Sequence, residues 1–219
     1  MAPPDLKFAR LEKPDDTFIE DAVDIFVSLM KQDPLAVALT GTDASLLPML
    51  CRVMLRGLVL TPGLGEAYAA TDASGALAGF LVFSLPGQLL FSTETSRAFG
   101  FYDYAKRLSE QARKYFLGAM AQLPPDPNVR REGERAAYWC NMAFVRKEWQ
   151  GQGVATALFG MSFKRAAELK AAKMGLIATD PGNLPIYKAI GYQLTDHKVI
   201  QSPWNEYNLW FFARDVEID

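Results

Sequence analysis

The chain has 219 residues, of which 50% are hydrophobic and 22% charged, the usage of an ordinary globular protein rather than a disordered one. Its 23 Lys and Arg residues against 25 Asp and Glu give a net charge of -2. This balance argues against a nucleic-acid-binding protein, because phosphate neutralisation needs an excess of basic side chains. At about 100 to 200 residues per domain, the length predicts one domain with an added segment.

The N-terminal part of the chain is expected to alternate strands and helices. Asp15 and the polar residues after it precede apolar residues at helical spacing, which predicts a helix that begins there. Pro34 and Gly41 break this pattern, and Asp43 or Ser45 is placed to cap the next helix. The expected elements are a strand at residues 6–11, helices at 18–30 and 46–60, and a hairpin of strands at 66–70 and 77–83.

Residues 86–135 interrupt the alternation and form the expected added segment, a helical insertion. A single helix rich in aromatic side chains is predicted over residues 99–120. The expected role of these aromatic residues is core packing. The alternative is a lid over the site of an acceptor molecule. The residues concerned are Phe99, Phe101, Tyr102 and Tyr104.

The C-terminal part returns to alternation, in an order that defines the fold class. Strands are predicted at residues 136–145, 176–179, 193–201 and 207–216, and helices at 151–174 and 184–190. The order of elements predicts an α/β (or α+β) fold with a mixed central sheet flanked by helices. We expect a single domain over residues 1–219, with the insertion at 86–135.

The few cysteine and histidine residues limit the chemistry. Cys51 and Cys140 lie among apolar neighbours, which predicts small buried side chains in a reducing compartment. With a single histidine, His197, neither a metal site nor a nucleophile–histidine machine is expected. Residues 1–16 lack the apolar run of a signal peptide, and no run of about 18 apolar residues predicts a membrane span. The expected location is the cytoplasm or nucleus, with no membrane partner.

The segment around residue 150 predicts an anion site. A strand ends at Val145, a turn contains Gly151 and Gly153, and a long helix follows. Glycines let the backbone approach a ligand closely, and the free N–H groups of a first helical turn attract negative charge. The segment therefore has the construction of a site for a phosphate-bearing ligand.

Two motifs carry a resemblance to a known family. Gln150, Gly153 and Ala155 fit the pattern [RQ]-x-x-G-x-[GA], with the aliphatic Val145 five residues upstream. In residues 182–192, a tyrosine, Tyr187, is followed by Gly-Tyr. In this order, joined by a helix and a strand, the two motifs resemble those of the GNAT (GCN5-related N-acetyltransferase) superfamily. The resemblance covers most of the chain outside residues 86–135.

The resemblance implies acetyl-CoA as cofactor and no metal. The backbone of residues 143–145 is expected to pair with the pantetheine arm, and the N–H groups of residues 151–156 to hold the pyrophosphate. The N–H of Ala143 is also placed to stabilise the oxyanion, a contribution of about 3 kcal/mol. Tyr187 is expected to be the general acid, or else a packing residue; Asn183 either binds pantetheine or caps its helix. The expected cofactor-binding residues are Ala143, Phe144, Val145, Gln150, Gly151, Gln152, Gly153, Val154, Ala155, Thr156 and Asn183.

The catalytic base is where the sequence departs from the family pattern. Many members place Glu or His nine or eleven residues before the turn signature, where this chain has Asn141 and Trp139. Neither side chain accepts a proton at neutral pH. Strand alternation is expected to place Trp139, Asn141 and Ala143 on one face, shaping the acceptor pocket. The candidates left open for the base are Glu66, Glu134, His197 and a water chain.

Together these features predict an N-acetyltransferase that moves acetyl directly from acetyl-CoA to a primary amine of a small molecule. A protein or peptide N-acetyltransferase is the first alternative. A non-catalytic module that binds acyl-CoA is the second. The acceptor, the acyl preference and the oligomeric state are left open.

Overall fold

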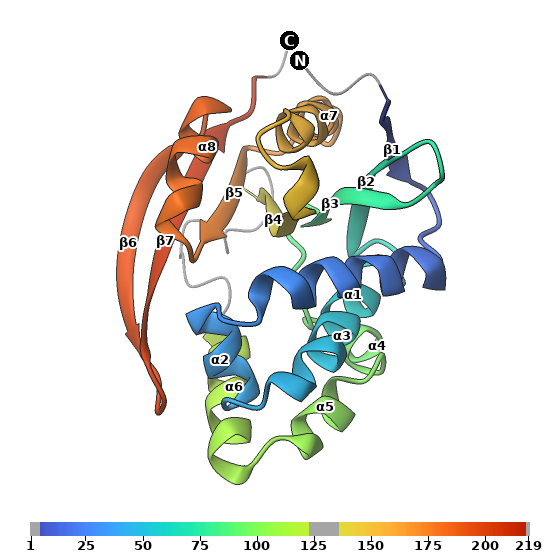
Figure 1. Cartoon of the computed structure of the whole chain (residues 1–219). Helices are drawn as coiled ribbons and strands as arrows, with labels where there is room; N and C mark the ends of the chain where they lie inside the picture. Colours follow the sequence, from blue (N-terminus) through green and yellow to red (C-terminus); the bar gives the residue numbers. More distant parts are fainter. Residues whose placement is uncertain (1–4, 123–135, 218–219) are drawn as a thin grey trace.

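A seven-stranded mixed sheet forms the centre of the molecule in the computed structural model, which describes residues 5–122 and 136–217 (Figure 1). The strand order is β1-β2-β3-β4-β5-β7-β6, and neighbours are antiparallel except for the parallel pair β4 and β5. The strands are β1 (Lys7–Leu11), β2 (Gly65–Thr71), β3 (Leu77–Ser84), β4 (Ala137–Val145), β5 (Lys173–Ala178), β6 (Gln193–Gln201) and β7 (Glu206–Asp215). The mixed sheet of the predicted α/β fold is confirmed.

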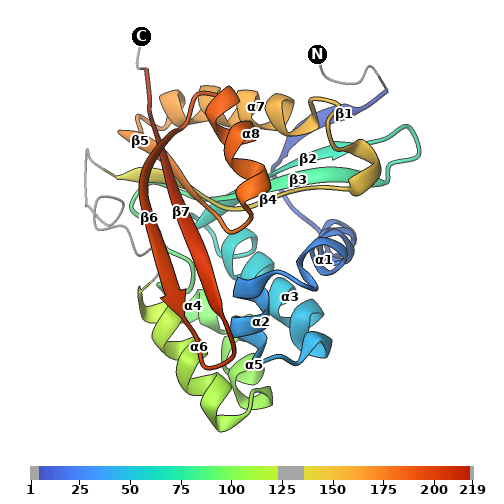
Figure 2. The ribbon, with the colours of Figure 1, turned by 60° about the vertical axis from the view of Figure 1, so that its left-hand side comes forward.

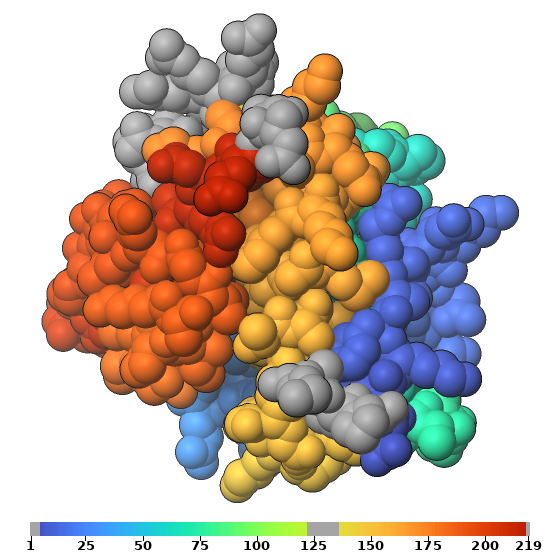
Figure 3. Space-filling model, turned by 90° about the horizontal axis from the view of Figure 1, so that it is seen from above, coloured from blue at the N-terminus to red at the C-terminus, as the bar shows by residue number. Residues whose placement is uncertain are grey.

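Helices cover both faces of the sheet. They are α1 (Asp16–Met30), α2 (Pro34–Thr40), α3 (Leu47–Val59), α4 (Glu94–Arg97), α5 (Phe101–Arg107), α6 (Glu110–Gln122), α7 (Val154–Glu168) and α8 (Leu184–Ala189). Helices α7 and α8 lie on one side, whereas α1 and α3 lie on the other, with α4 to α6 beyond them (Figure 2). Seen from above, α7 fills the middle of its face, between the β6–β7 hairpin and the N-terminal strand (Figure 3).

Helix α2 is an element that the sequence did not predict. Pro34 and Gly41 were expected to break the helical pattern, but they bound a short helix of their own. Pro34 stands in its first turn, where its missing N–H costs nothing, and the Asp33 side chain accepts hydrogen bonds from Leu35 and Ala36. Gly41 ends the helix at φ 62°, a left-handed conformation that suits glycine.

The predicted helix over residues 99–120 is wrong in one respect, because the structure divides it into α5 and α6. Leu108 is extended, with ψ at 147°, and Ser109 starts the second helix by accepting the Ala112 N–H at 3.3 Å. Phe101, Tyr104 and Phe116 are then buried together against α2 and α3. The aromatic residues Phe101 and Tyr104 therefore belong to a core, as the sequence suggests, and Tyr102 is exposed.

A β-bulge in β4 overturns one expectation about the site. Val82 pairs with Met142 but Phe83 pairs with Cys140, so Asn141 is the extra residue. A bulge shifts the alternation of side chains. Ala143 therefore packs on the α7 side with Cys140, whereas Met142 and Phe144 pack on the α1 side. The prediction that Trp139, Asn141 and Ala143 share one face is wrong for this reason.

The sheet opens between β4 and β5. Their parallel pairing runs from Ala137–Lys173 to Cys140–Leu176 and stops there, while β5 continues against β7. Beyond this point the edge of β4 that faces β5 has no strand partner in the part of the chain that is described. The opening places a free backbone edge beside the loop that leads into α7.

No single helix of residues 5–122 and 136–217 is long and apolar enough to cross a membrane. The segments Pro34–Thr40 and Ala44–Val59, bent by 90° relative to one another, pass that test together by length and composition.

Candidate active site

One cavity of about 1500 Å³ lies where β4 and β5 separate. Part of its wall is the loop into α7 together with α8. Most of the remaining lining is apolar, and it comes from the strands of the sheet, from α1, α2 and α3, and from the insertion helix α6. The lining includes Met30, Leu35, Leu39, Leu50, Met54, Tyr115, Met120, Asn141, Ala143, residues 149–156, Thr179, Asn183 and Tyr187. The predicted site residues from both motifs thus line one cavity.

The loop into α7 presents a row of free donors. Gly151 and Gly153 have φ of 72° and 81°, so the chain turns sharply before the helix. Within the described residues, the N–H groups of residues 151–156 donate to no other group; the first helical bond runs from Ala157 to the Gly153 carbonyl. Six unpaired amides at the positive end of α7 fit a pyrophosphate group without a metal ion.

The glutamine side chains of this loop support its shape. Gln150 donates from Nε2 to the Val145 carbonyl at 2.9 Å, and Gln152 donates to the Glu148 carbonyl at 2.7 Å. These bonds tie the turn to the end of β4. The side chains of Gln150 and Gln152 therefore stabilise the backbone conformation of the loop. The hydrogen-bond donors that face the cavity are the backbone N–H groups.

The free edge of β4 belongs to Ala143 and Val145. The Arg146 N–H donates to Ala78 of β3, and hydrogen-bonded residues alternate in an antiparallel pair. Phe144 consequently bonds to β3, and the polar groups of Ala143 and Val145 point to the open side. The Phe144 ring lies in the core beside Phe26, with 5.4 Å between ring centroids. The structure thus places the Ala143 N–H toward the opening.

Tyr187 lies in α8 with its ring packed on Phe159 and Phe212. The residue is 9% exposed and lines the cavity. Burial raises the pKa of its hydroxyl, which therefore keeps its proton at neutral pH. Among the residues that the structure describes, none accepts a hydrogen bond from this hydroxyl. Asn183 stands before α8, and its side chain makes no capping bond, so capping is not its role.

Trp139 and Asn141, which stand where the sequence pattern was expected to supply a base, are neutral side chains that line the cavity. Asn141 donates from Nδ2 to the Ser84 hydroxyl at 2.8 Å and to the Trp139 carbonyl at 3.1 Å. The Trp139 ring occupies the space above Gly175, where an added Cβ would lie 2.4 Å from the ring. Both residues shape the wall, as the sequence predicts.

The other candidates for a base lie elsewhere. Glu66 is bound by Tyr138 at 2.5 Å, and Arg10 and Arg165 pair with it; it does not line the cavity. His197 stacks on Trp210 in the β6–β7 hairpin, also away from the cavity. Glu134 lies outside the described residues.

Glu66 is a structural carboxylate, and its replacement tests this assignment. Burial raises its pKa, but hydrogen bonds from Tyr138 and Arg10 outweigh burial and lower the pKa overall. Its contribution is therefore present above the unfolded pKa of about 4.3 and is lost as pH falls through the lower folded pKa. We expect Glu66→Gln to cost about 1 to 3 kcal/mol of unfolding free energy at pH 7, with kcat unchanged, measured by urea unfolding and acetyl transfer.

The matched control for that variant is Glu168→Gln. Glu168 pairs with the same Arg165 but its side chain is 63% exposed, so its removal is expected to cost close to nothing. A large loss of kcat in Glu66→Gln at unchanged stability would contradict the structural role and return Glu66 to the list of bases.

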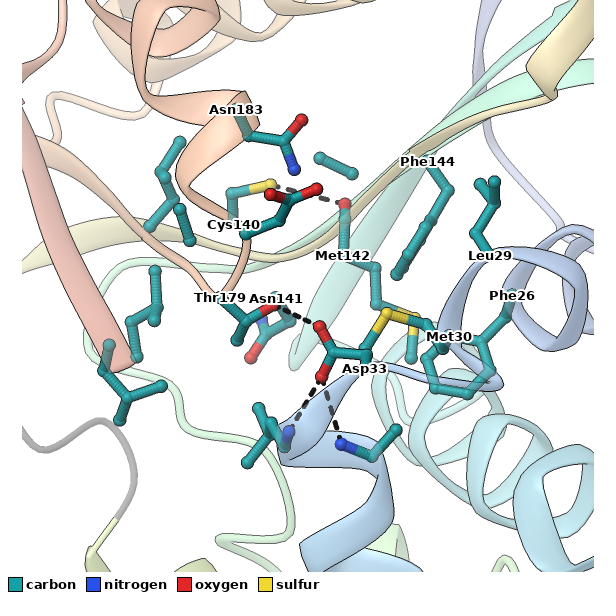
Figure 4. A pocket seen from close by; sticks show the side chains of 18 of the residues that line it. Phe26, Leu29, Met30, Asp33, Cys140, Asn141, Met142, Phe144, Thr179 and Asn183 are labelled. Carbon is teal, nitrogen blue, oxygen red and sulfur yellow. Dashed lines mark hydrogen bonds between the residues drawn. The ribbon is translucent and has the colours of Figure 1, made fainter. Parts of the chain in front are cut away.

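Sequence reasoning missed a carboxylate in the cavity. Asp33 Oδ2 accepts a hydrogen bond from Thr179 Oγ1 at 2.6 Å, which joins the start of α2 to the end of β5 (Figure 4). The local signal was Asp33 followed by proline, a helix start. Thr179 stands 146 positions further along the chain, so the pairing itself left no mark in the sequence.

Among the described residues, neither a metal-binding cluster nor a reactive thiol is found. Residues 5–122 and 136–217 contain no group of three or more His, Cys, Asp and Glu side chains placed to hold a metal ion. Cys51 and Cys140 are both free and buried, which confirms the prediction that they are small buried side chains.

Comparison with known proteins agrees with the two sequence motifs. Residues 128–202 match the family model of the acetyltransferase (GNAT) domain. No curated protein matches the chain. Residues 128–202 are therefore similar to an acetyltransferase domain of the GNAT family, in the part of the chain that holds both sequence motifs.

Solved structures share the fold over nearly the whole chain. Arylalkylamine N-acetyltransferase 2 from Aedes aegypti has a TM-score of 0.61 at 14% identity, covering 97% of this chain and 99% of its own. NAA60 from Arabidopsis thaliana, in complex with a bisubstrate analogue, has a TM-score of 0.57 at 12% identity; the match covers 98% of this chain and 99% of NAA60. The ribosomal-protein-S18-alanine N-acetyltransferase from Escherichia coli has a TM-score of 0.52 at 10% identity; the match covers 98% of this chain and 96% of that enzyme. At these identities the likeness establishes the fold.

Proposed function

We propose that the protein transfers acetyl from acetyl-CoA directly to a primary amine of a small molecule. The observation that carries the proposal is the single cavity, which joins the free amides of the α7 loop and Tyr187 to an apolar space beneath α6. A cofactor held at the loop and an acceptor held in the apolar space would meet beside the open edge of β4.

Different groups of this chain bind the cofactor and stabilise the reacting thioester. The N–H groups of residues 151–156 hold the pyrophosphate, and the edge formed by Ala143 and Val145 pairs with the pantetheine arm. When bound, acetyl-CoA supplies an acyl group activated as a thioester. The Ala143 N–H donates to the oxygen that gains negative charge, which is worth about 3 kcal/mol in comparable sites. Asn183 lines the same cavity and is placed to bind the pantetheine arm.

The proposed transfer balances without another reactant. Starting from the neutral amine, a C–N bond forms and the C–S bond breaks; one proton leaves the nitrogen for solvent, and one passes from Tyr187 Oη to sulfur. Tyr187 then regains a proton from solvent. Cys140 lines the cavity but does not serve as a nucleophile, because burial raises the pKa of its thiol and disfavours the thiolate. Direct attack by the amine follows from that assignment.

A protein or peptide acceptor is the second candidate, since the S18-alanine enzyme that shares the fold is named for acetylation of a ribosomal protein. A peptide requires an open groove beside the first helices and the closing hairpin. In this chain α6 lines the cavity from that side, and the Tyr115 hydroxyl on α6 meets the Tyr207 hydroxyl of β7 at 2.6 Å. This contact between the insertion and the hairpin favours a small acceptor.

Release of CoA from acetyl-CoA, measured with a panel of small primary amines and peptides with free N-termini, tests the proposal. We expect release that depends on small amines and exceeds release with peptides. Turnover with peptides alone would overturn the choice of acceptor. Tight acetyl-CoA binding without turnover on any amine would favour a non-catalytic binding module. We place the enzyme in the cytoplasm, which two free cysteines suit.

A further inference from the structure

We infer that the acceptor is an amphiphilic primary amine, whose cationic end is bound by Asp33 and whose apolar body fills the space between α2, α3 and α6. The inference rests on the proposed function and names the substrate class of its acceptor side. It draws on a carboxylate and an apolar wall that the cofactor-binding motifs do not use.

The carboxylate of Asp33 has an unused acceptor position that faces the cavity. Oδ1 accepts the N–H groups of Leu35 and Ala36 at 2.9 and 3.1 Å, and Oδ2 accepts the Thr179 hydroxyl at 2.6 Å. An ionised carboxylate offers about four acceptor positions, so Oδ2 retains capacity for one more donor. No described basic side chain pairs with Asp33. A bound ammonium group satisfies both the charge and the open position, and it loses one proton to solvent before its nitrogen attacks the thioester.

The position of Asp33 suits an acceptor group. Figure 4 shows Asp33 and Thr179 pointing toward one another, with Asn141 nearby and Met30 and Met142 beside the carboxylate. These residues come from opposite walls at the opening between β4 and β5. An amine bound there lies on the acceptor side of the cavity and near the bulged part of β4.

The charges around the cavity leave Asp33 as its inward-facing anion. Three charged side chains line the cavity among the described residues: Asp33, Lys114 and Asp180. Asp180 is exposed and accepts the Gly182 N–H at 2.8 Å, and Lys114 lies on the exposed surface of α6. Asp33 alone is partly buried. A cation within the apolar space has this carboxylate as its counterion.

The wall beyond Asp33 requires an apolar body. It is formed by Met30, Leu35, Leu39, Leu50, Met54 and Met120, from α1, α2, α3 and α6. An acceptor with polar groups along its length would lose hydrogen bonds to water against this wall. The unbranched methionine side chains adapt to different shapes, so the body is selected by apolarity rather than by a fixed outline. Each buried methylene contributes about 0.8 kcal/mol, or about a fourfold gain in affinity.

Steady-state kinetics with n-butylamine, n-hexylamine, n-octylamine and 8-amino-1-octanol test the inference. We expect KM to fall by about fourfold per methylene from butylamine to octylamine, and to rise again for the amino alcohol, whose hydroxyl would be buried against the apolar wall. Asp33→Asn is expected to raise KM for octylamine by tenfold or more with KM for acetyl-CoA unchanged. Asn keeps the cap of α2, because it is as good an N-cap residue as Asp.

Thr179→Val is the matched control, since it removes the hydrogen bond to Oδ2 but keeps the charge. We expect it to change KM for octylamine by less than threefold. An equal effect of both variants would reduce Asp33 to a structural role and overturn the inference. Turnover that prefers polar amines and ignores Asp33→Asn would overturn it and leave the proposed function standing. No turnover with any amine, in the wild type, would instead overturn the proposed function.

Discussion

Replacing Tyr187 by phenylalanine is expected to lower kcat by about 100-fold or more, the usual range for loss of a positioned general acid. The ring fills the same space against Phe159 and Phe212, so folding is expected to be retained. Burial raises the pKa of the Tyr187 hydroxyl, so the wild type keeps this proton across neutral and mildly alkaline pH. KM for acetyl-CoA is expected to change little, because in the proposed arrangement the loop amides hold the cofactor.

Tyr192→Phe is the control for this variant. Tyr192 lies in the same core, packed on Phe159, but its hydroxyl is fully buried with no partner among the described residues and does not line the cavity. Removing a buried hydroxyl without a partner is expected to leave kcat unchanged and stability equal or higher. An unchanged kcat in Tyr187→Phe, or an equal loss in both variants, would contradict the role of Tyr187 as acid.

The part of the site that is local in sequence was predictable. Gly151 and Gly153 take the positive φ values that their place before a helix suggests, and the row of free amides follows from that geometry. Tyr187 was found through a second local motif, and both motifs reach one cavity because the fold brings α8 to the end of β5. Short-range patterns contain this information, since caps, turns and strand ends depend on neighbours in the chain.

The acceptor side of the cavity was not predictable in the same way. Asp33 meets Thr179 across 146 positions, and the bulge at Asn141 depends on how β3 and β4 pair. Neither the pairing register nor the division of the insertion at Leu108 follows from hydrophobic periodicity. Pro34 breaks the helical pattern that precedes it, but a capping residue before proline also signals the start of a new helix. In the proposed arrangement, acceptor choice depends on these tertiary details, whereas cofactor binding depends on local ones.

A negative charge at residue 156 is expected to have opposite effects on two properties: it stabilises α7 but weakens the binding of acetyl-CoA. Thr156 is exposed in the first turn of the helix and lines the cavity beside the free amides. An acidic side chain there interacts favourably with the helix dipole, by about 0.3 to 1 kcal/mol. The same charge repels a pyrophosphate bound at those amides. We therefore expect Thr156→Glu to unfold at equal or higher temperature and to bind acetyl-CoA at least tenfold more weakly.

Thr156→Gln separates charge from size, because it adds a side chain of the same length without the charge. We expect it to bind acetyl-CoA within threefold of the wild type, measured by calorimetry. Added salt screens charge repulsion, so the difference between the Glu and Gln variants is expected to shrink as ionic strength rises. Equal affinities for the two variants at low salt would contradict binding of the pyrophosphate at this helix start. A lower unfolding temperature of Thr156→Glu would contradict the expected dipole effect and would show that the Thr156 side chain stabilises the loop.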